Sequence, residues 1–214
     1  ATPPLQAAAA GTETIPVIGT CVTDYATALS IDNWTGTTGR NISGTSDLAP
    51  LDEQAAMIQD LFPDAKTIGL LYCSGEPNSV YQIDIVESTL TEMGYTCERF
   101  SFTDSNDVAA VTQAACNGSD VIYIPTDNTA ASNTQLIANI VLPAKVPVIA
   151  GEQGICEGCG VATLSIDYYE IGYQAGMMAY DILANGADIT TMEVQTSSNV
   201  TKMYNASVCE QLGL

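Results

Sequence analysis

The chain repeats one pattern: a short run of apolar and β-branched residues, then a polar turn, then a segment with apolar residues three and four positions apart. A clear example is TIGLLYC (67–73), followed by SGEPNS and a periodic segment. The periodic residues are Val80, Ile83, Val86, Leu90 and Met93. The first run has the composition of a buried strand, and the spacing predicts an amphipathic helix. Gly94 is the expected end of that helix.

The same alternation continues toward the C-terminus. Strands are expected around 95–102, 121–125, 147–150 and 161–165, and helices at 107–116 and around Ile137, Ile140 and Val141. A last helix carries Ile171, Ala175, Met178 and Ile182 on one face and ends at Gly186. Strands that alternate with helices in this way are typical of an α/β fold, with parallel sheets covered by helices on both faces.

Polar residues follow the apolar strands. They are Thr23 and Asp24 after IPVIGTCV, Asn78 and Ser79 after IGLLYC, Thr126 to Asn128 after VIYIP, Glu152 after VPVIAG, and Asp167 after VATLSI. In parallel sheets, ligands bind outside the carboxyl ends of the strands, where loop side chains and helix N-termini converge. Each residue alone could be a helix N-cap, since Ser, Thr, Asp and Asn are preferred there. Five such turns together predict a polar binding cleft.

Composition narrows the possible functions. With 46% hydrophobic residues in 214, the chain can bury a core, and no apolar run reaches the roughly 18 to 20 residues of a membrane-spanning helix. Twenty-five acidic residues face five basic ones, for a formal net charge of -20. The five cations are scattered, so binding to a nucleic-acid backbone or an anionic membrane is not expected.

The chain has no histidine, which excludes Ser-His-Asp and Cys-His catalysis and imidazole-based zinc sites. Seven cysteines are spread along the sequence, and only Cys156 and Cys159 form a C-x-x-C pair. That pair could be a local disulfide, two free thiols, or a redox centre. The sequence predicts no cofactor, no metal site and no catalytic residue.

At the strand ends the chain resembles a known family. The segments ATPPLQAAAA, IPVIGTCVTD, NISGTSDL, LLYCSGEPNS, YIPTDNTAAS and ATLSIDYYEIGYQAG occur in the order found in the tryptophan/tyrosine-binding branch of the ABC-transporter substrate-binding proteins. The resemblance runs from residue 1 to the terminal QLGL. It implies a two-lobed type I periplasmic-binding fold outside the cytoplasm, periplasmic or lipid-anchored. Such a protein closes on a small solute, expected to be an amino acid, and passes it to a membrane permease.

The resemblance also implies a division into lobes. Residues 1–64 and 167–195 would form the first lobe, and 65–166 and 196–214 the second. Family members carry further strand-helix units before the segment matching ATPPLQ, so the first lobe is expected to be incomplete and any signal or anchor segment to lie outside this chain.

The polar residues at the strand ends and the resemblance to the family together predict the solute-binding residues. They are Thr2, Thr23, Asp24, Asp47, Asn78, Ser79, Asp127, Glu152 and Asp167. Of the five cations only Arg40 is near these segments, so we expect hydroxyls and helix N-terminal amides, at Thr2 and Thr23, to bind a solute carboxylate. Asp127, Glu152 and Asp167 are the expected partners of an ammonium group.

Three points stay open from sequence. Tyr25 replaces the proline that usually follows the VTD triplet, and it could stack on a planar solute or pack the turn. Trp34, in a Gly- and Thr-rich loop, is expected at the surface or rim. The same fold also serves as the sensing domain of receptors and regulators, and a thiol oxidoreductase using Cys156 and Cys159 is a further alternative.

Overall fold

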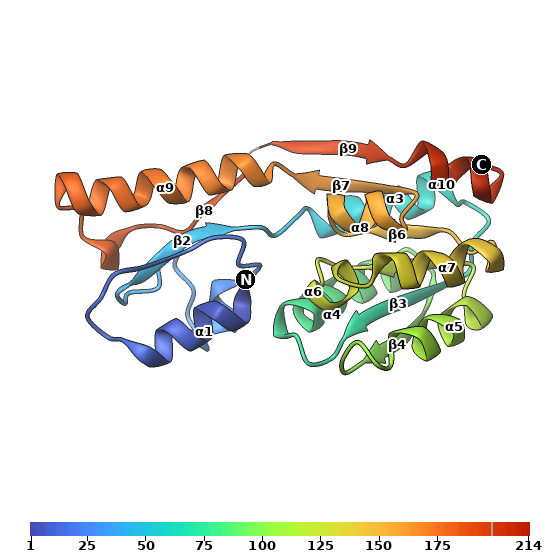
Figure 1. Cartoon of the computed structure of the whole chain (residues 1–214), viewed down its shortest axis with the longest axis horizontal. Coiled ribbons are helices and arrows are strands. Elements are labelled where there is room, and N and C mark those ends of the chain that lie inside the picture. Colours follow the sequence, from blue (N-terminus) through green and yellow to red (C-terminus); the bar gives the residue numbers. More distant parts are fainter. Residues whose placement is uncertain (198) are drawn as a thin grey trace. The chain divides into compact units, whose positions relative to one another are not determined.

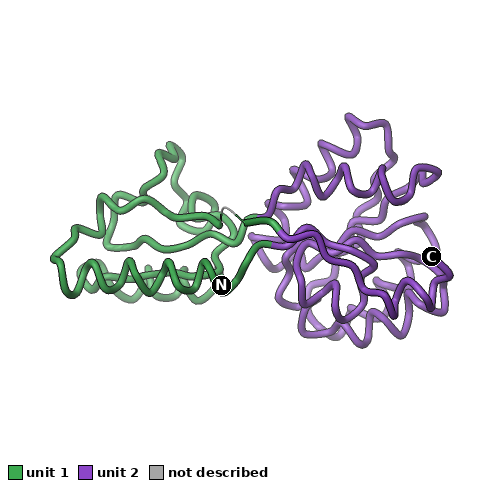
Figure 2. The backbone as a smooth tube through the Cα atoms, turned by 90° about the horizontal axis from the view of Figure 1, so that it is seen from above, with its two compact units in different colours: residues 1–48, 166–200 green, residues 49–165, 201–214 purple. Residues whose placement is uncertain are grey.

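The computed structural model describes residues 1–197 and 199–214. Unit 1 comprises Ala1–Leu48 and Ile166–Val200, and unit 2 comprises Ala49–Ser165 and Thr201–Leu214 (Figure 2). Both contain parallel strands packed with helices, which confirms the predicted α/β class (Figure 1). Within the described residues, no helix has the length and apolar character needed to cross a membrane.

Unit 2 is built on a six-stranded sheet of order β4-β3-β5-β6-β7-β9. Its strands are β3 (Thr67–Cys73), β4 (Thr96–Phe102), β5 (Val121–Ile124), β6 (Val148–Ala150), β7 (Ala162–Ile166) and β9 (Val200–Tyr204). Its helices are α3 (Leu51–Leu61), α4 (Pro77–Glu92), α5 (Val108–Gly118), α6 (Asn128–Ala131), α7 (Thr134–Ala144), α8 (Gln153–Gly158) and α10 (Ala206–Leu212). The first five strands in the sheet order are parallel, so their carboxyl ends share one edge.

The two faces of this sheet are covered by different helices. Side chains such as Leu71, Ile122 and Val148 form one core cluster with residues of α5, α7 and α8. Because strand side chains alternate, their neighbours Leu70 and Tyr123 are buried on the opposite face, where α3 and α4 pack. Helices on both faces explain why these strands read as continuous apolar runs in the sequence.

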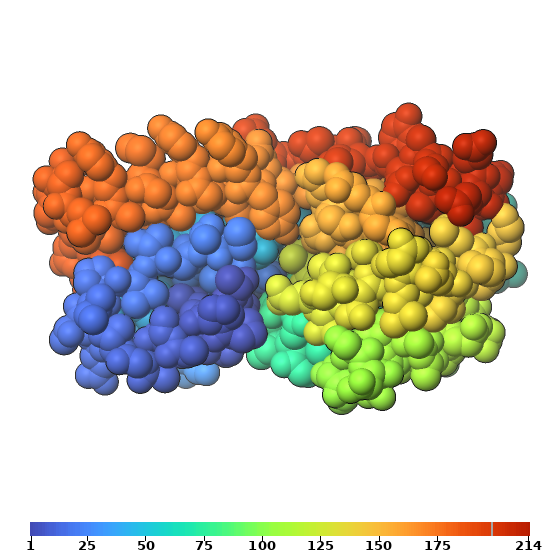
Figure 3. All heavy atoms as spheres, in the orientation of Figure 1, coloured from blue at the N-terminus to red at the C-terminus, as the bar shows by residue number. Residues whose placement is uncertain are grey.

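Unit 1 has a smaller parallel sheet of order β1-β2-β8. Its elements are α1 (Thr2–Gly11), β1 (Val17–Gly19), α2 (Tyr25–Leu29), β2 (Ile42–Ser46), α9 (Tyr168–Asn185), a 3-10 turn (Ile189–Thr191) and β8 (Gln195–Thr196). Helix α9, orange in Figure 3, packs against β2 and β1 with Ile171, Ala175 and Met178 buried. It ends at Gly186 in the left-handed conformation, as predicted.

Gly44 is required for the packing of unit 1. It has a φ of +148°, and a Cβ added there would lie 1.9 Å from the Gly19 carbonyl oxygen and 2.4 Å from the Tyr25 hydroxyl. Only glycine therefore lets β1 and β2 pair while the Tyr25 ring lies beneath them.

The observed elements agree with the predicted strands and helices. The division into units differs from the expected lobe boundary near residue 64, because α3 belongs to unit 2. The reason is a long-range contact, since the buried Gln54 of α3 donates hydrogen bonds to the carbonyls of Gly151 and Leu164.

Candidate functional site

In unit 1, the segments that follow β1 and β2 lie side by side. The Val22 amide donates to the Thr45 carbonyl (3.4 Å), the Asp47 amide donates to the Val22 carbonyl (3.4 Å), and the Ser46 hydroxyl donates to the Thr23 carbonyl (2.8 Å). These bonds bring Thr23 and Asp47 together at the carboxyl ends of two parallel strands. Both were candidates, and the structure buries both.

Asp47 is a buried carboxylate with an oxygen that has no partner. Its residue is only 4% exposed, and Oδ1 accepts no hydrogen bond in the part of the chain that the structure describes. Burial raises the pKa of Asp47, against the opposing effect of a hydrogen bond from the Thr23 side chain. A positively charged partner at Oδ1 would therefore stabilise the ionised form.

Thr2 is the second orphan polar group of unit 1. It is 2% exposed, and no described residue bonds its Oγ1. The Ala1 amino group donates to the Cys21 carbonyl, so α1 begins beside the end of β1. The next residues, Pro3 and Pro4, have no N–H, and the Leu5 amide donates to the Ala1 carbonyl, so this helix N-terminus has fewer free amides for an anion than expected.

The other two candidates of unit 1 are helix caps. Asp24 accepts the Thr27 amide (2.7 Å) at the start of α2. Asp167 is exposed and accepts the Glu170 amide (3.0 Å) at the start of α9. Their carboxylates satisfy first-turn N–H groups, which is the alternative that N-cap preference suggested.

In unit 2, Asn78 and Ser79 are buried in the first turn of α4, after β3. The Asn78 Nδ2 donates to the Thr126 carbonyl (3.2 Å), and the fully buried Gln82 pairs with both the amide and the carbonyl of Thr126. The turns after β3 and β5 are thereby joined. Asn78 Oδ1 is buried and has no partner among the described residues.

Asp127 and Glu152 also cap helices. Asp127 accepts the Ala130 amide at Oδ1 (2.8 Å) and the Cys73 amide at Oδ2 (2.7 Å). Glu152 accepts the amides of Gly154 (2.6 Å) and Ile155 (2.5 Å). Burial and the nearby Glu76 raise the pKa of Asp127, and its backbone hydrogen bonds oppose that shift. Both residues follow strands at the shared carboxyl edge, and that they bind an ammonium stays a prediction.

Glu76 was missed by the sequence analysis, although it precedes α4 directly. Its carboxylate is 8% exposed and accepts hydrogen bonds from the amides and side chains of Asn128 and Thr129. These bonds lower the pKa of Glu76 although burial opposes them. Glu76 therefore fixes the start of α6 beside α4, and these two partners in α6 lie 52 and 53 residues away in sequence.

The structure buries one of the two aromatic residues considered in the sequence analysis and exposes the other. Tyr25 is 2% exposed, belongs to the core of unit 1, and its hydroxyl donates to the Thr45 carbonyl (3.4 Å), so it packs the turn. Trp34 is 40% exposed, as expected for a surface or rim residue.

The two cysteines of the C-x-x-C pair are buried free thiols. All seven cysteines are free, and Cys156 and Cys159 are both buried. Burial raises the pKa of each of these two thiols to about 12, which suppresses the thiolate that redox chemistry requires. Among the described residues, no group of three or more Cys, Asp or Glu side chains is arranged to hold a metal ion.

Comparison with known proteins identifies a family whose members are similar to this chain. The family model for ABC transporter substrate binding proteins matches residues 1–214. A tyrosine-binding protein of Clostridioides difficile (strain R20291) is 31% identical over 213 residues, 100% of this chain and 61% of that protein.

Two solved structures are also similar over the whole chain. A crystal structure of an ABC domain from Streptococcus pneumonia in complex with L-Trp has 30% identity and a TM-score of 0.93, and the match covers 73% of that chain. The ligand-free, open structure of a Clostridium difficile substrate binding protein with adhesive properties has 35% identity and a TM-score of 0.74, over 72% of that chain. The chain spans 61% of the length of the tyrosine-binding protein of Clostridioides difficile.

Proposed function

The chain belongs to the family of ABC transporter substrate-binding proteins, and from this premise we propose that it binds an aromatic amino acid outside the cytoplasm and delivers it to the permease of an ABC importer. The solute class is supported by similarity to a tyrosine-binding protein and to a structure holding L-Trp. We also propose that units 1 and 2 correspond to the first and second lobes of the family.

One observation carries the proposal: buried oxygens without partners occur where a solute is expected. In the described chain they are Thr2 Oγ1 and Asp47 Oδ1 in unit 1, and Asn78 Oδ1 in unit 2. A buried polar group left unsatisfied costs about 1–3 kcal/mol, so a solute that supplies the missing partners is bound favourably. Four other side chains also have such oxygens, but they do not follow the carboxyl ends of the strands. Thr112 lies in α5, Ser119 directly after α5, Thr163 in β7 and Gln174 in α9.

The groups of unit 1 match the ends of an amino acid. Asp47 would accept a hydrogen bond from the solute ammonium, whose charge stabilises the carboxylate that burial disfavours. Thr2 would donate its hydroxyl proton to the solute carboxylate. Asn78 offers a further acceptor at the sheet edge of unit 2.

The test is the substitution Asp47→Asn, with Asp64→Asn as the matched control. Both exchange a carboxylate for an amide, but Asp64 is exposed and lies before β3, away from the carboxyl ends of the strands. Truncating a buried charged hydrogen bond costs about 2 kcal/mol or more, so Asp47→Asn should weaken L-tryptophan or L-tyrosine binding about thirty-fold in titration calorimetry.

A solute analogue isolates the ammonium contact. Indole-3-propionate lacks the amino group, so its affinity should change little between the parent and Asp47→Asn. Equal L-tryptophan affinity in the parent and in Asp47→Asn would overturn the assigned role of Asp47. Absence of binding of either aromatic amino acid to the parent protein would overturn the proposed solute.

A further inference from the structure

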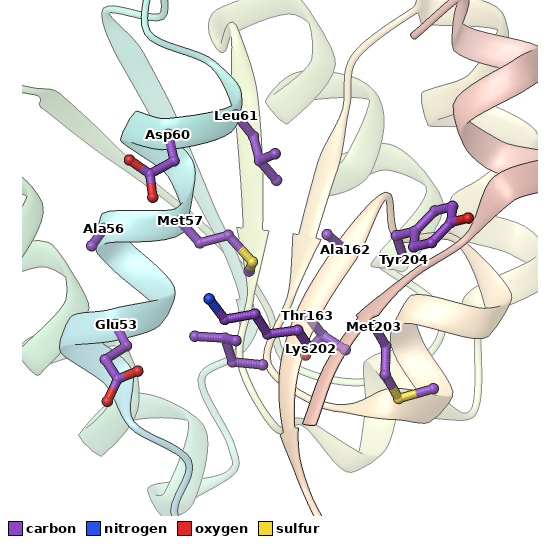
Figure 4. A pocket seen from close by; sticks show the side chains of 11 residues that line it. Glu53, Ala56, Met57, Asp60, Leu61, Ala162, Thr163, Lys202, Met203 and Tyr204 are labelled. Atoms are coloured by element: carbon purple, nitrogen blue, oxygen red, sulfur yellow. The ribbon is translucent and has the colours of Figure 1, made fainter. Parts of the chain in front are cut away.

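A pocket of 410 Å³ lies inside unit 2, between α3 on one side and β7 and β9 on the other (Figure 4). None of the candidate solute-binding residues lines it. Its volume is within the range of small-molecule sites, about 300–1,000 Å³. It is therefore separate from the polar strand ends described above.

The walls combine an apolar surface with charges of both signs. Met57 and Leu61 of α3 and Met203 of β9 supply apolar surface, while Glu53 and Asp60 of α3 and Lys202 of β9 supply charges. Glu53, Met57 and Leu61 are four residues apart, so they form one stripe of the helix. The stripe borders the buried face of α3, which packs on the core through Ala55 and Ile58.

The three charged side chains are free to bind a ligand. The ion pairs in the described part of the chain are those of Arg99, with Asp84 and Glu87. Figure 4 shows Lys202 extending from β9 toward α3 and Met57, with the Glu53 and Asp60 carboxylates at opposite ends of the helix face. An ammonium on one wall and carboxylates on the other are complementary to a zwitterion.

We propose that this pocket is a second binding site, for a free amino acid with an apolar side chain. Lys202 binds its carboxylate, Glu53 or Asp60 binds its ammonium, and the side chain packs against Met57, Leu61 and Met203. Two carboxylates against one ammonium, in a protein of net charge -20, disfavour an anionic ligand. The site lies within unit 2 alone, so it does not depend on the proposed function.

Methionine methyl groups provide a local probe. Six methionines are present, of which Met57 and Met203 line the pocket and Met93, after α4, does not. In protein labelled with ¹³C at the methionine methyls, titration with L-tryptophan should shift the Met57 and Met203 resonances through its ring current. Half-saturation is expected on the order of 1 mM, because exposed ion pairs contribute little. Met93 should not move, and glycine, which lacks an apolar side chain, should cause no comparable shift.

Variants separate a specific site from general association. Lys202→Met keeps the apolar stem and should weaken the response about five-fold, whereas Lys66→Met, an exposed lysine outside the pocket, should not. Tryptophanamide and N-acetyltryptophan, each lacking one charge, should bind more weakly than tryptophan.

Several results would overturn the second site. They are unshifted Met57 and Met203 resonances, an equal shift of Met93, an equal response to glycine, and an unchanged titration in Lys202→Met. In Asp47→Asn the Met57 response should persist, so failure of this site and failure of the proposed function give different results.

Discussion

Gln54 connects α3 to three neighbouring strands of unit 2, and replacing it should destabilise that unit. The side chain is fully buried. Its Nε2 donates to the carbonyls of Gly151 (3.0 Å) and Leu164 (2.8 Å), and its Oε1 accepts the hydroxyl of Tyr123 (2.6 Å). Tyr123 lies in β5, Gly151 directly follows β6, and Leu164 lies in β7.

Gln54→Leu keeps a similar volume but removes all three bonds. Each of three buried groups left without its partner costs about 1 kcal/mol at the low end, so the loss is about 3 kcal/mol. The additional apolar surface of leucine recovers about 1 kcal/mol. We therefore expect the free energy of unfolding to fall by about 2 kcal/mol.

Urea unfolding followed by far-ultraviolet circular dichroism measures this change. Gln59→Leu is the matched control, because Gln59 is an exposed glutamine on the same helix and its replacement should change stability by less than about 0.5 kcal/mol. A loss for Gln54→Leu no larger than for Gln59→Leu would show that the three bonds do not hold α3 to the sheet.

Two further predictions follow from buried ionisable groups. Burial raises the pKa of Cys156 and Cys159 to about 12, so iodoacetamide should modify them far more slowly at neutral pH in the folded protein than in urea, and fast labelling would contradict this. Burial also raises the pKa of Asp47, so the folded protein favours the neutral carboxyl group. The contribution of this group to the free energy of unfolding is fully present below its unfolded pKa of about 3.9 and is lost as the pH rises through its folded pKa. Without solute, Asp47→Asn should therefore gain stability relative to the parent as the pH rises above about 4, measured as the difference in melting temperature, and a pH-independent difference would contradict this.

Secondary structure was predictable because the local pattern is strong. The apolar residues of α4 follow helical spacing, and Gly94 after it has a positive φ, as the sequence indicated. The strands of unit 2 are buried on both faces, so they stand out as continuous apolar runs. The unit to which α3 belongs was not predictable, because it depends on contacts between Gln54 and residues about 100 positions away.

The roles of the acidic residues were only partly predictable. Asp24, Asp127, Glu152 and Asp167 each directly precede a helix and accept its first-turn amides. Asp47 differs, because Leu48 to Pro50 separate it from α3 in sequence, and α3 has no side-chain cap. Separation from the next helix was therefore a signal in the sequence that distinguishes the four caps from Asp47, whose Oδ1 has no partner among the described residues. The partners of Glu76 carried no such local signal.

Under the proposed function, the amino group of the solute contributes more to recognition than the carboxylate. The first turn of α1 offers few free amides, because Pro3 and Pro4 have none and the Leu5 amide is bonded to Ala1. The carboxylate is then left with the Thr2 hydroxyl and the helix macrodipole, which contributes about 0.3–1 kcal/mol. A buried contact between Asp47 and the ammonium is worth about 2 kcal/mol or more. Under this proposal, the ammonium group is therefore the part of the solute that chiefly determines selection.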